Sequence, residues 1–338
     1  MFRKPVVFIV GAGASKEYGL PSGGELASTI ATAVNELNAP TRRDTSLFDL
    51  LISAYGPDAM AKYLDAGKKL AAAISSAASI DDALHRLSDF PEAVELGKIC
   101  IIKSILETEA RSSLQLREGR LQLDTGKDGW IEYLFSIAIE NKKLSEVPHA
   151  FDNVTFINFN YDRCLEHYLF WSLQRIGLNE QDAANTVAGL SMIRPYGTIG
   201  SILPTAPDFW QFGNTDFRRD LRDTMSRISR IRTYTESEAL HDPGKVRDVM
   251  TQAAMYIFLG FGFHPSNLDL ISVATATPVT NPLLLATVKG VHEENLGELK
   301  LSLQNRLKVY DGYVGLIRDM TASQLLSQLR LRISLLVG

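Results

Sequence analysis

The chain has 338 residues, of which 45% are hydrophobic and 22% are charged, and its formal net charge is −4 at pH 7. This length allows one large domain or two ordinary ones, and the composition is that of a globular protein. The slight excess of negative charge excludes a protein that binds nucleic acid through overall positive charge.

The two cysteines, Cys100 and Cys164, form no CxxC pair, which excludes a structural zinc ribbon. We expect each to be a small buried hydrophobe in a reducing compartment. The apolar run at residues 6–10 is too short for an export signal, and no stretch approaches the roughly 18 apolar residues that a membrane span requires. The sequence therefore predicts a soluble, cytoplasmic protein.

Four short apolar runs predict strands that are covered on both faces of a parallel sheet. In chain order they are Val6–Val10, Val154–Phe159, Met255–Leu259 and Leu283–Val288. The segments between them are predominantly helical. Because strands of this kind alternate with helices in α/β proteins, the sequence predicts an α/β fold with crossover connections.

The first predicted helix covers Glu25–Leu37, with Leu26, Ile30, Val34 and Leu37 on one face. Residues 41–150 show no convincing strand, and we interpret them as a helical insertion. Within it, Ser79 is the predicted N-cap of a helix that carries two aspartates in its first turn. At the other end of the chain, Thr321 and Gln324 fit a capping box before a helix whose apolar face carries Leu325, Leu329, Ile333 and Leu336.

A second inserted segment, residues 214–250, is rich in arginine. A helical stripe of apolar residues is flanked by arginines on the other faces; the stripe is Phe217, Leu221, Met225, Ile228 and Ile231, and the arginines are Arg218, Arg219, Arg222, Arg227, Arg230 and Arg232. The favoured interpretation is a solvated helix with ion pairs to neighbouring aspartates. The alternative is a surface for an acidic partner, a nucleic acid or a neighbouring subunit.

The first predicted strand runs directly into Gly11-Ala12-Gly13, a turn that can bring backbone N–H groups against a pyrophosphate. The GxxxxGK[ST] phosphate loop is excluded, because Lys16 and Tyr18 stand where its second glycine is needed. Lys16 also replaces the third glycine of the dehydrogenase GxGxxG pattern, which disfavours a dehydrogenase. A tight turn without a ligand remains an alternative. The following Gly19-Leu20-Pro21-Ser22 predicts a second ordered turn over the first.

Three stretches, in this order, resemble the sirtuin cofactor site: GAGASKEYGLPSGGEL from Gly11, FINFNYDRCLEH from Phe156, and IFLGFGFHPSNLDLI from Ile257. Together with YGTIG, they are most similar to the sirtuin-like proteins of bacterial antiphage defence. The resemblance spans residues 6–270. It implies a Rossmann-like parallel sheet of the sirtuin type, with NAD⁺ as substrate. Sirtuin deacylases carry a zinc module built from four cysteines, and because this chain has only two it cannot build one, which disfavours protein deacylation. The resemblance also implies a division into residues 1–40 and 151–300 as the NAD-binding domain, 41–150 and 205–250 as inserts, and 301–338 as a helical tail.

The resemblance implies four catalytic residues. Asn160 reaches the ribose hydroxyls or the attacking water, and Asp162 accepts a hydrogen bond from the nicotinamide carboxamide. Tyr196 stands where the family usually has a histidine, and because a phenol is a poor base near neutral pH, His264 is the leading substitute base. The alternatives are a turn cap for Asn160, an ion pair with Arg163 for Asp162, and an ordinary loop histidine for His264.

The residues that the resemblance assigns to cofactor binding follow the same motifs. They are Gly11, Ala12, Gly13, Ala14, Ser15, Leu20, Pro21, Gly260, Gly262, Phe263, Asn267 and Gly290, of which Gly11, Gly13 and Ser15 suit the pyrophosphate. Asn267 has a helix cap as its alternative role. No histidine has metal-ligand spacing to another histidine or a cysteine, so no metal site is expected.

The resemblance therefore implies an NAD⁺ glycohydrolase that releases nicotinamide and ADP-ribose as the NAD-depleting effector of an antiphage system. Because an unregulated enzyme of this kind would be toxic, we expect activation by homo-oligomeric assembly or by a partner protein encoded alongside. We expect no direct contact with nucleic acid or membrane. Two alternatives stay open: a regulatory subunit that binds NAD⁺ or ADP-ribose without cleaving it, and an N-glycoside or nucleotide hydrolase with another substrate.

Overall fold

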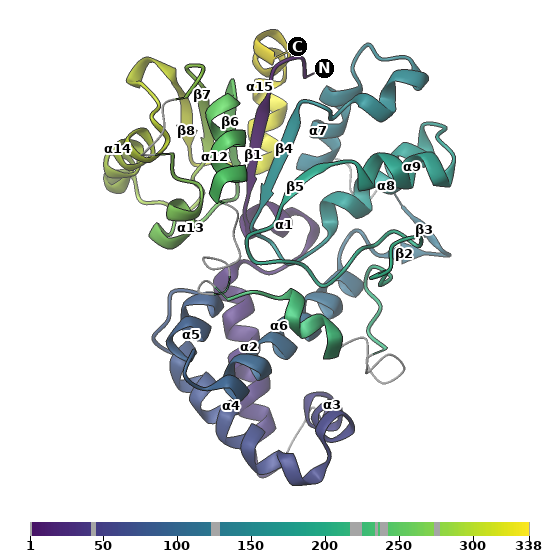
Figure 1. Cartoon of the computed structure of the whole chain (residues 1–338), viewed down its shortest axis with the longest axis vertical. Coiled ribbons are helices and arrows are strands. Elements are labelled where there is room, and N and C mark those ends of the chain that lie inside the picture. Colours follow the sequence, from purple (N-terminus) through teal and green to yellow (C-terminus); the bar gives the residue numbers. More distant parts are fainter. Residues whose placement is uncertain are drawn as a thin grey trace.

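The structure, a computed structural model, describes residues 2–41, 45–122, 129–216, 225–233, 236, 243–273 and 278–337. Its centre is a six-stranded sheet in the order β5-β4-β1-β6-β7-β8, and every strand pair is parallel. The strands are β1 (Val6–Val10), β4 (Val154–Asn158), β5 (Ser191–Ile193), β6 (Met255–Leu259), β7 (Leu283–Thr287) and β8 (Val314–Arg318). The fold is therefore α/β and Rossmann-like (Figure 1).

The strand order reverses at β1. The chain first builds outward from β1 to β4 and β5, and it then returns to place β6, β7 and β8 on the other side of β1. Such an order is that of the doubly wound dinucleotide-binding fold, in which ligands bind beyond the carboxyl ends of the strands at the point of reversal. The residues after β1 and β6 therefore occupy the position where a ligand site is expected.

The four strands predicted from apolar runs are confirmed, each within one residue of its predicted end. β5 and β8 were not predicted. Both are edge strands, and all three residues of β5 and all five of β8 are at least partly exposed, so neither shows a continuous apolar run. The segment predicted as a helical tail, 301–338, therefore contributes a strand to the sheet.

Helices cover both faces of the sheet (Figure 1). Alternate residues of β1 point to opposite faces, so that Phe8 and Val10 join one buried cluster while Val7 and Ile9 join the other. The Phe8 face is covered by α7 (Trp130–Ile139), α8 (Cys164–Arg175), α9 (Glu180–Ala188) and α15 (Ala322–Val337). The Val7 face carries α12 (Pro243–Gln252), α13 (Pro265–Leu270) and α14 (Leu296–Leu307).

A helical lobe lies beyond the carboxyl ends of the strands and shares the buried cluster of the Val7 face (Figure 1). It consists of α2 (Gly23–Asn38), α3 (Ser46–Tyr55), α4 (Met60–Ile74), α5 (Ile80–Arg86) and α6 (Pro91–Arg111). The packing of the helices differs from the expected division at residues 41 and 150. The predicted first helix, α2, packs on α4 and α6 of the lobe, whereas α7 packs on α8 and α15 beside the sheet.

The remaining elements are short. They are α1 (Ala12–Ser15), the hairpin of β2 (Leu116–Arg117) and β3 (Arg120–Leu121), and 3₁₀ turns at Lys16–Tyr18, Pro57–Ala59, Leu144–His149, Ile228–Arg230, Glu293–Asn295 and Asp311–Tyr313. The hairpin lies in the segment where no strand was expected. Among the described residues, no helix combines the length and the apolar character needed to cross a membrane.

The helix starts that were predicted from capping residues are confirmed. The Ser79 hydroxyl accepts a hydrogen bond from the backbone N–H of Asp82 at the start of α5. Thr321 and Gln324 form both bonds of the capping box before α15, and Leu325 and Ile333 of its predicted apolar face are buried. Leu329 is partly buried, and the side chain of Leu336 lies outside the described residues.

The arginine-rich segment differs from the solvated helix that was favoured. Residues 217–224 lie outside the described residues. Beyond them, Arg227 is buried; its guanidinium donates to the backbone carbonyls of Ile199 and Phe209 and lies 4.7 Å from the centre of the Trp210 ring. Residues 228–230 form a 3₁₀ turn, after which Ile231 pairs with Gly197. The expectation of a solvated arginine is therefore wrong for Arg227.

Candidate functional site

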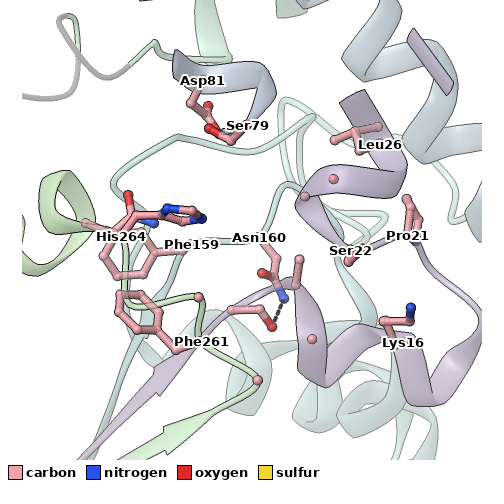
Figure 2. A pocket seen from close by; sticks show the side chains of 18 of the residues that line it. Lys16, Pro21, Ser22, Leu26, Ser79, Asp81, Phe159, Asn160, Phe261 and His264 are labelled. Atoms are coloured by element: carbon pink, nitrogen blue, oxygen red, sulfur yellow. Dashed lines mark hydrogen bonds between the residues drawn. The ribbon is translucent and has the colours of Figure 1, made fainter. Parts of the chain in front are cut away.

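A pocket of about 1140 Å³ lies between the carboxyl ends of the central strands and the helical lobe. The residues after β1, β4, β6 and β7 line one side, and α5 and the start of α2 line the other. Figure 2 shows this arrangement, with Asn160 between Phe261 and His264 on one side and Lys16, Pro21 and Ser22 on the other. The pocket therefore coincides with the reversal point of the strand order.

Most predicted site residues meet in this one pocket. All four predicted catalytic residues line it, and so do seven of the residues assigned to cofactor binding: Asn160, Asp162, Tyr196, His264, Gly11, Ala12, Gly13, Pro21, Gly260, Gly262 and Asn267. The three sequence stretches that carry the resemblance thus converge at one place, although 129 and 89 residues of chain separate them.

The glycines of the first loop act by allowing two turns to approach each other. A Cβ on Gly11 would lie 2.6 Å from the carbonyl oxygen of Gly260, and one on Gly260, where φ is +57°, would lie 2.0 Å from the nitrogen of Ala14. In this contact the N–H groups of Gly11 and Gly13 donate to the carbonyls of Leu259 and Gly260, at 3.0 and 2.9 Å. These two N–H groups are therefore not available to a pyrophosphate, which corrects the role predicted for them.

The helix after the loop is short. α1 contains only Ala12–Ser15 and is followed by a 3₁₀ turn that ends at Gly19, with φ +88°. The predicted second turn is present, because the N–H of Leu20 donates to the carbonyl of Ser15. Ala12 is the first residue of α1, and its N–H has no acceptor within the helix. Ala12 also lines the pocket.

Asn160 is buried and rigidly oriented. Its Nδ2 donates to the carbonyl of Gly11 at 3.1 Å and to the Ser15 hydroxyl at 3.0 Å, which places its Oδ1 on the opposite side of the amide. Oδ1 is buried and has no hydrogen-bond partner among the residues that the structure describes. The alternative of a turn cap is wrong for Asn160, because both of its donors hold the first glycine loop. A buried acceptor without a donor is costly, so a bound hydroxyl or water would stabilise it.

Asp162 is buried two residues further along. Its carboxylate accepts hydrogen bonds from the N–H of Cys164, at 3.1 Å, and from the Ser15 side chain. Burial raises the pKa of Asp162 above its usual value, and these hydrogen bonds oppose the rise. The alternative ion pair with Arg163 is wrong, because the Arg163 guanidinium is bound to Glu109 of α6.

Tyr196 is a buried hydrogen-bond donor. Its hydroxyl donates to Oδ1 of Asn267, and its ring contacts those of Phe159 and Tyr161, with centroids 5.9 and 6.2 Å away. Asn267 is therefore not the cap of α13; the N-cap position belongs to His264. His264 is exposed, and it lies at the side of the pocket close to Phe159 in Figure 2.

Five predicted binding residues do not line the pocket: Ala14, Ser15, Leu20, Phe263 and Gly290. Ala14 and Leu20 are buried in the cluster on the Phe8 face. Ser15 acts indirectly, through Asn160 and Asp162. Phe263 packs its ring against Phe258 and Phe261. Gly290 lies in the turn after β7, where its neighbour Lys289 lines the pocket instead.

Sequence reasoning missed several other charged residues of the pocket. Lys16 and Lys289 line it from the sheet side, and the ammonium of Lys16 lies 2.7 Å from Glu25 of α2. Asp81 and His85 line it from α5 of the lobe. The Ser-Ile-Asp-Asp stretch signals the helix start correctly, but no local pattern indicates that this start faces the glycine loop.

Asp81 is half-buried, and one of its carboxylate oxygens accepts a hydrogen bond from the Tyr161 hydroxyl. Burial raises the pKa of Asp81 to about 6, while the hydrogen bond from Tyr161 opposes the rise. Among the described residues, no group of three or more histidine, cysteine, aspartate or glutamate side chains could hold a metal ion. Cys100 and Cys164 are both buried, as expected.

No protein-family model matches the chain, and no curated protein matches it either.

Proposed function

We propose that the chain binds NAD⁺ in this pocket and hydrolyses the bond between nicotinamide and ribose. The observation that carries the proposal is the buried, unpartnered Oδ1 of Asn160, held in place at the point where the three sirtuin-like stretches converge. A ribose hydroxyl or a water molecule supplies the donor that this oxygen lacks. The residues present therefore suit a sugar hydroxyl beside the glycine loop.

The rest of the pocket is consistent with a dinucleotide. Its volume of about 1140 Å³ exceeds the upper end of the range usual for small-molecule sites, about 1,000 Å³, and so is ample for a ligand with two nucleotide units. Lys16, Lys289 and the N–H of Ala12 are the groups that we assign to the pyrophosphate. Because cleavage builds positive charge on the ribose, as in glycoside hydrolysis, the carboxylates of Asp81 and Asp162 stabilise the transition state.

The test is release of nicotinamide from NAD⁺, measured alone and with the proteins encoded beside this chain. Asn160→Ala removes the acceptor, and we expect at least a 100-fold lower rate. Asn185→Ala, an exposed asparagine on α9, is the matched control and should leave the rate unchanged. Equal rates for the wild type and Asn160→Ala would refute the assignment of the site.

One observation favours a second candidate, a subunit that binds NAD⁺ or ADP-ribose without cleaving it. The position of the family's histidine is occupied by Tyr196, whose hydroxyl proton is committed to Asn267. Unchanged NAD⁺ recovered from a tight complex, with no release under either assay condition, would decide for this candidate. In both cases the resemblance leads us to propose a role in antiphage defence, with control by assembly or by a partner.

A further inference from the structure

The helical lobe places a carboxylate opposite the glycine loop. Asp81 lies in the first turn of α5, behind the N-cap Ser79, and Figure 2 shows both residues above the pocket. The next residue, Asp82, is used by the lobe itself, since its carboxylate accepts from the N–H of Ala78 at 3.1 Å and from Arg86 at 2.7 Å. Asp81 forms no ion pair among the described residues. Of the two aspartates, Asp81 is therefore the one whose carboxylate is open to a ligand.

Asp81 is held by the loop that carries Asn160. The buried Tyr161, between Asn160 and Asp162 in sequence, donates its hydroxyl to Oδ1 of Asp81. This hydrogen bond links residues that are 80 positions apart and joins the lobe to the carboxyl end of β4. It fixes one carboxylate oxygen of a residue that lines the pocket in which the proposed function places the substrate.

We propose that Asp81 is the general base of the hydrolysis, an inference that rests on the proposed function. Asp81 takes a proton from the attacking water, whose oxygen forms a bond to the anomeric carbon of the ribose. The bond from that carbon to the nicotinamide nitrogen breaks, and its electron pair leaves with neutral nicotinamide. The proton on Asp81 then passes to solvent through the mouth of the pocket.

The surroundings of Asp81 suit this role better than those of His264. A general base works best when its pKa lies close to the working pH, and burial brings the pKa of Asp81 to about 6. The titratable groups around it are Tyr161, which donates to Asp81, Tyr196 and Glu236, which interact electrostatically with that phenol, and Asp82 and His85 on α5 itself. His264 is exposed, and its side chain has no hydrogen-bond partner among the described residues that would orient it.

The experiment is the pH dependence of kcat for nicotinamide release. For the wild type we expect kcat to rise with pH through an apparent pKa near 6, as Asp81 becomes ionised. Asp81→Asn should lower kcat by about 10²–10⁴-fold, remove this acid limb and change KM little. Tyr161→Phe should shift the limb to higher pH, because the hydrogen bond from Tyr161 lowers the pKa of Asp81. Added formate should restore part of the activity of Asp81→Ala.

Two variants serve as comparisons. Asp65→Asn makes the same chemical change at an exposed position of α4 in the same lobe and should behave as the wild type. His264→Gln should keep the acid limb. A limb that persists in Asp81→Asn, or one that disappears in His264→Gln, would overturn the role of Asp81 and leave the proposed function standing. No nicotinamide release from the wild type under any condition would overturn the proposed function, and this role with it.

Discussion

Replacing Glu109 by glutamine should destabilise the protein far more than the loss of a surface ion pair. Glu109 of the lobe helix α6 and Arg163 of the Asn160 loop are 0% and 1% exposed. Nε of Arg163 donates to Oε1 of Glu109 at 3.1 Å, Nη2 donates to Oε2, and the N–H of Gly213 also donates to Oε2, at 3.1 Å. Glu109→Gln therefore leaves a buried guanidinium without a counter-ion.

The magnitude follows from this geometry. Removing one partner of a buried, hydrogen-bonded ion pair costs about 3–5 kcal/mol, because the remaining charge stays out of water. The entropy of unfolding is about 2.1 cal/mol/K per residue, which for a chain of 338 residues is about 0.7 kcal/mol/K. A loss of about 4 kcal/mol therefore lowers Tm by about 6 °C. Because α6 and the Asn160 loop both contribute residues to the pocket, among them Ile105 and Asp162, we also expect weaker NAD⁺ binding under the proposed function.

The assay is thermal unfolding followed by circular dichroism, together with a double-mutant cycle. In Glu109→Met/Arg163→Met both charges are absent. The double variant should therefore lose less free energy of unfolding than the two single variants together, by at least about 2 kcal/mol. The carbonyl of Trp210, which accepts from Arg163, loses its partner in the double variant and limits the recovery. A shift of Tm below 1 °C for Glu109→Gln, as for an exposed pair, would refute the reasoning.

Three further predictions follow from the site. Gly260→Ala should lower the free energy of unfolding by about 3 kcal/mol or more, because its Cβ meets backbone atoms of Gly13 and Ala14. Gly290→Ala, at φ +82° with nothing within 4 Å of the added Cβ, should lower it by only about 1–2 kcal/mol. Urea unfolding measures both changes. Asp81 has a pKa raised from 3.8 to about 6, so its contribution to stability is fully present below pH 4 and is lost as the pH rises through 6. The stability of Asp81→Asn relative to wild type should therefore increase by up to about 3 kcal/mol between pH 4 and pH 7, and a constant difference would contradict the raised pKa. Tyr196→His should leave kcat no higher and should move its acid limb to lower pH, because a protonated imidazole near Tyr161 lowers the pKa of Asp81. A tenfold gain in kcat would mean that residue 196, not Asp81, limits proton transfer.

The parts of the site that follow strands could be predicted from the sequence. A buried apolar run identifies β1, β4 and β6, and the polar or glycine residues after such runs gather at one edge of a parallel sheet. Asn160 and Asp162 after β4, and His264 after β6, meet for this reason. Strand order alone is enough to predict that these residues converge, without knowledge of other contacts between distant segments.

Other features depend on contacts that no local pattern carries. The N–H groups of Gly11 and Gly13 donate to the carbonyls of Leu259 and Gly260 because of the register between β1 and β6. In this register Val10 lies beside Leu259, so the turns that follow the two strands are in contact. Likewise, the role of Asp81 depends on a hydrogen bond to a residue 80 positions away. β8 was not predicted, because this exposed edge strand has no continuous run of buried apolar residues. Local sequence thus indicates where the site lies, and tertiary packing decides which of its atoms are free.

The tyrosine at position 196 and the carboxylate at position 81 belong to one buried arrangement. The ring of Tyr196 lies 6.2 Å from that of Tyr161, and Tyr161 donates to Asp81. A protonated histidine at position 196 would place a positive charge near this phenol and would lower the pKa of Asp81. The neutral Tyr196 lets burial dominate, so that the pKa of Asp81 stays near 6. Under the proposed function, the tyrosine at position 196 is therefore compatible with a general base supplied by the lobe.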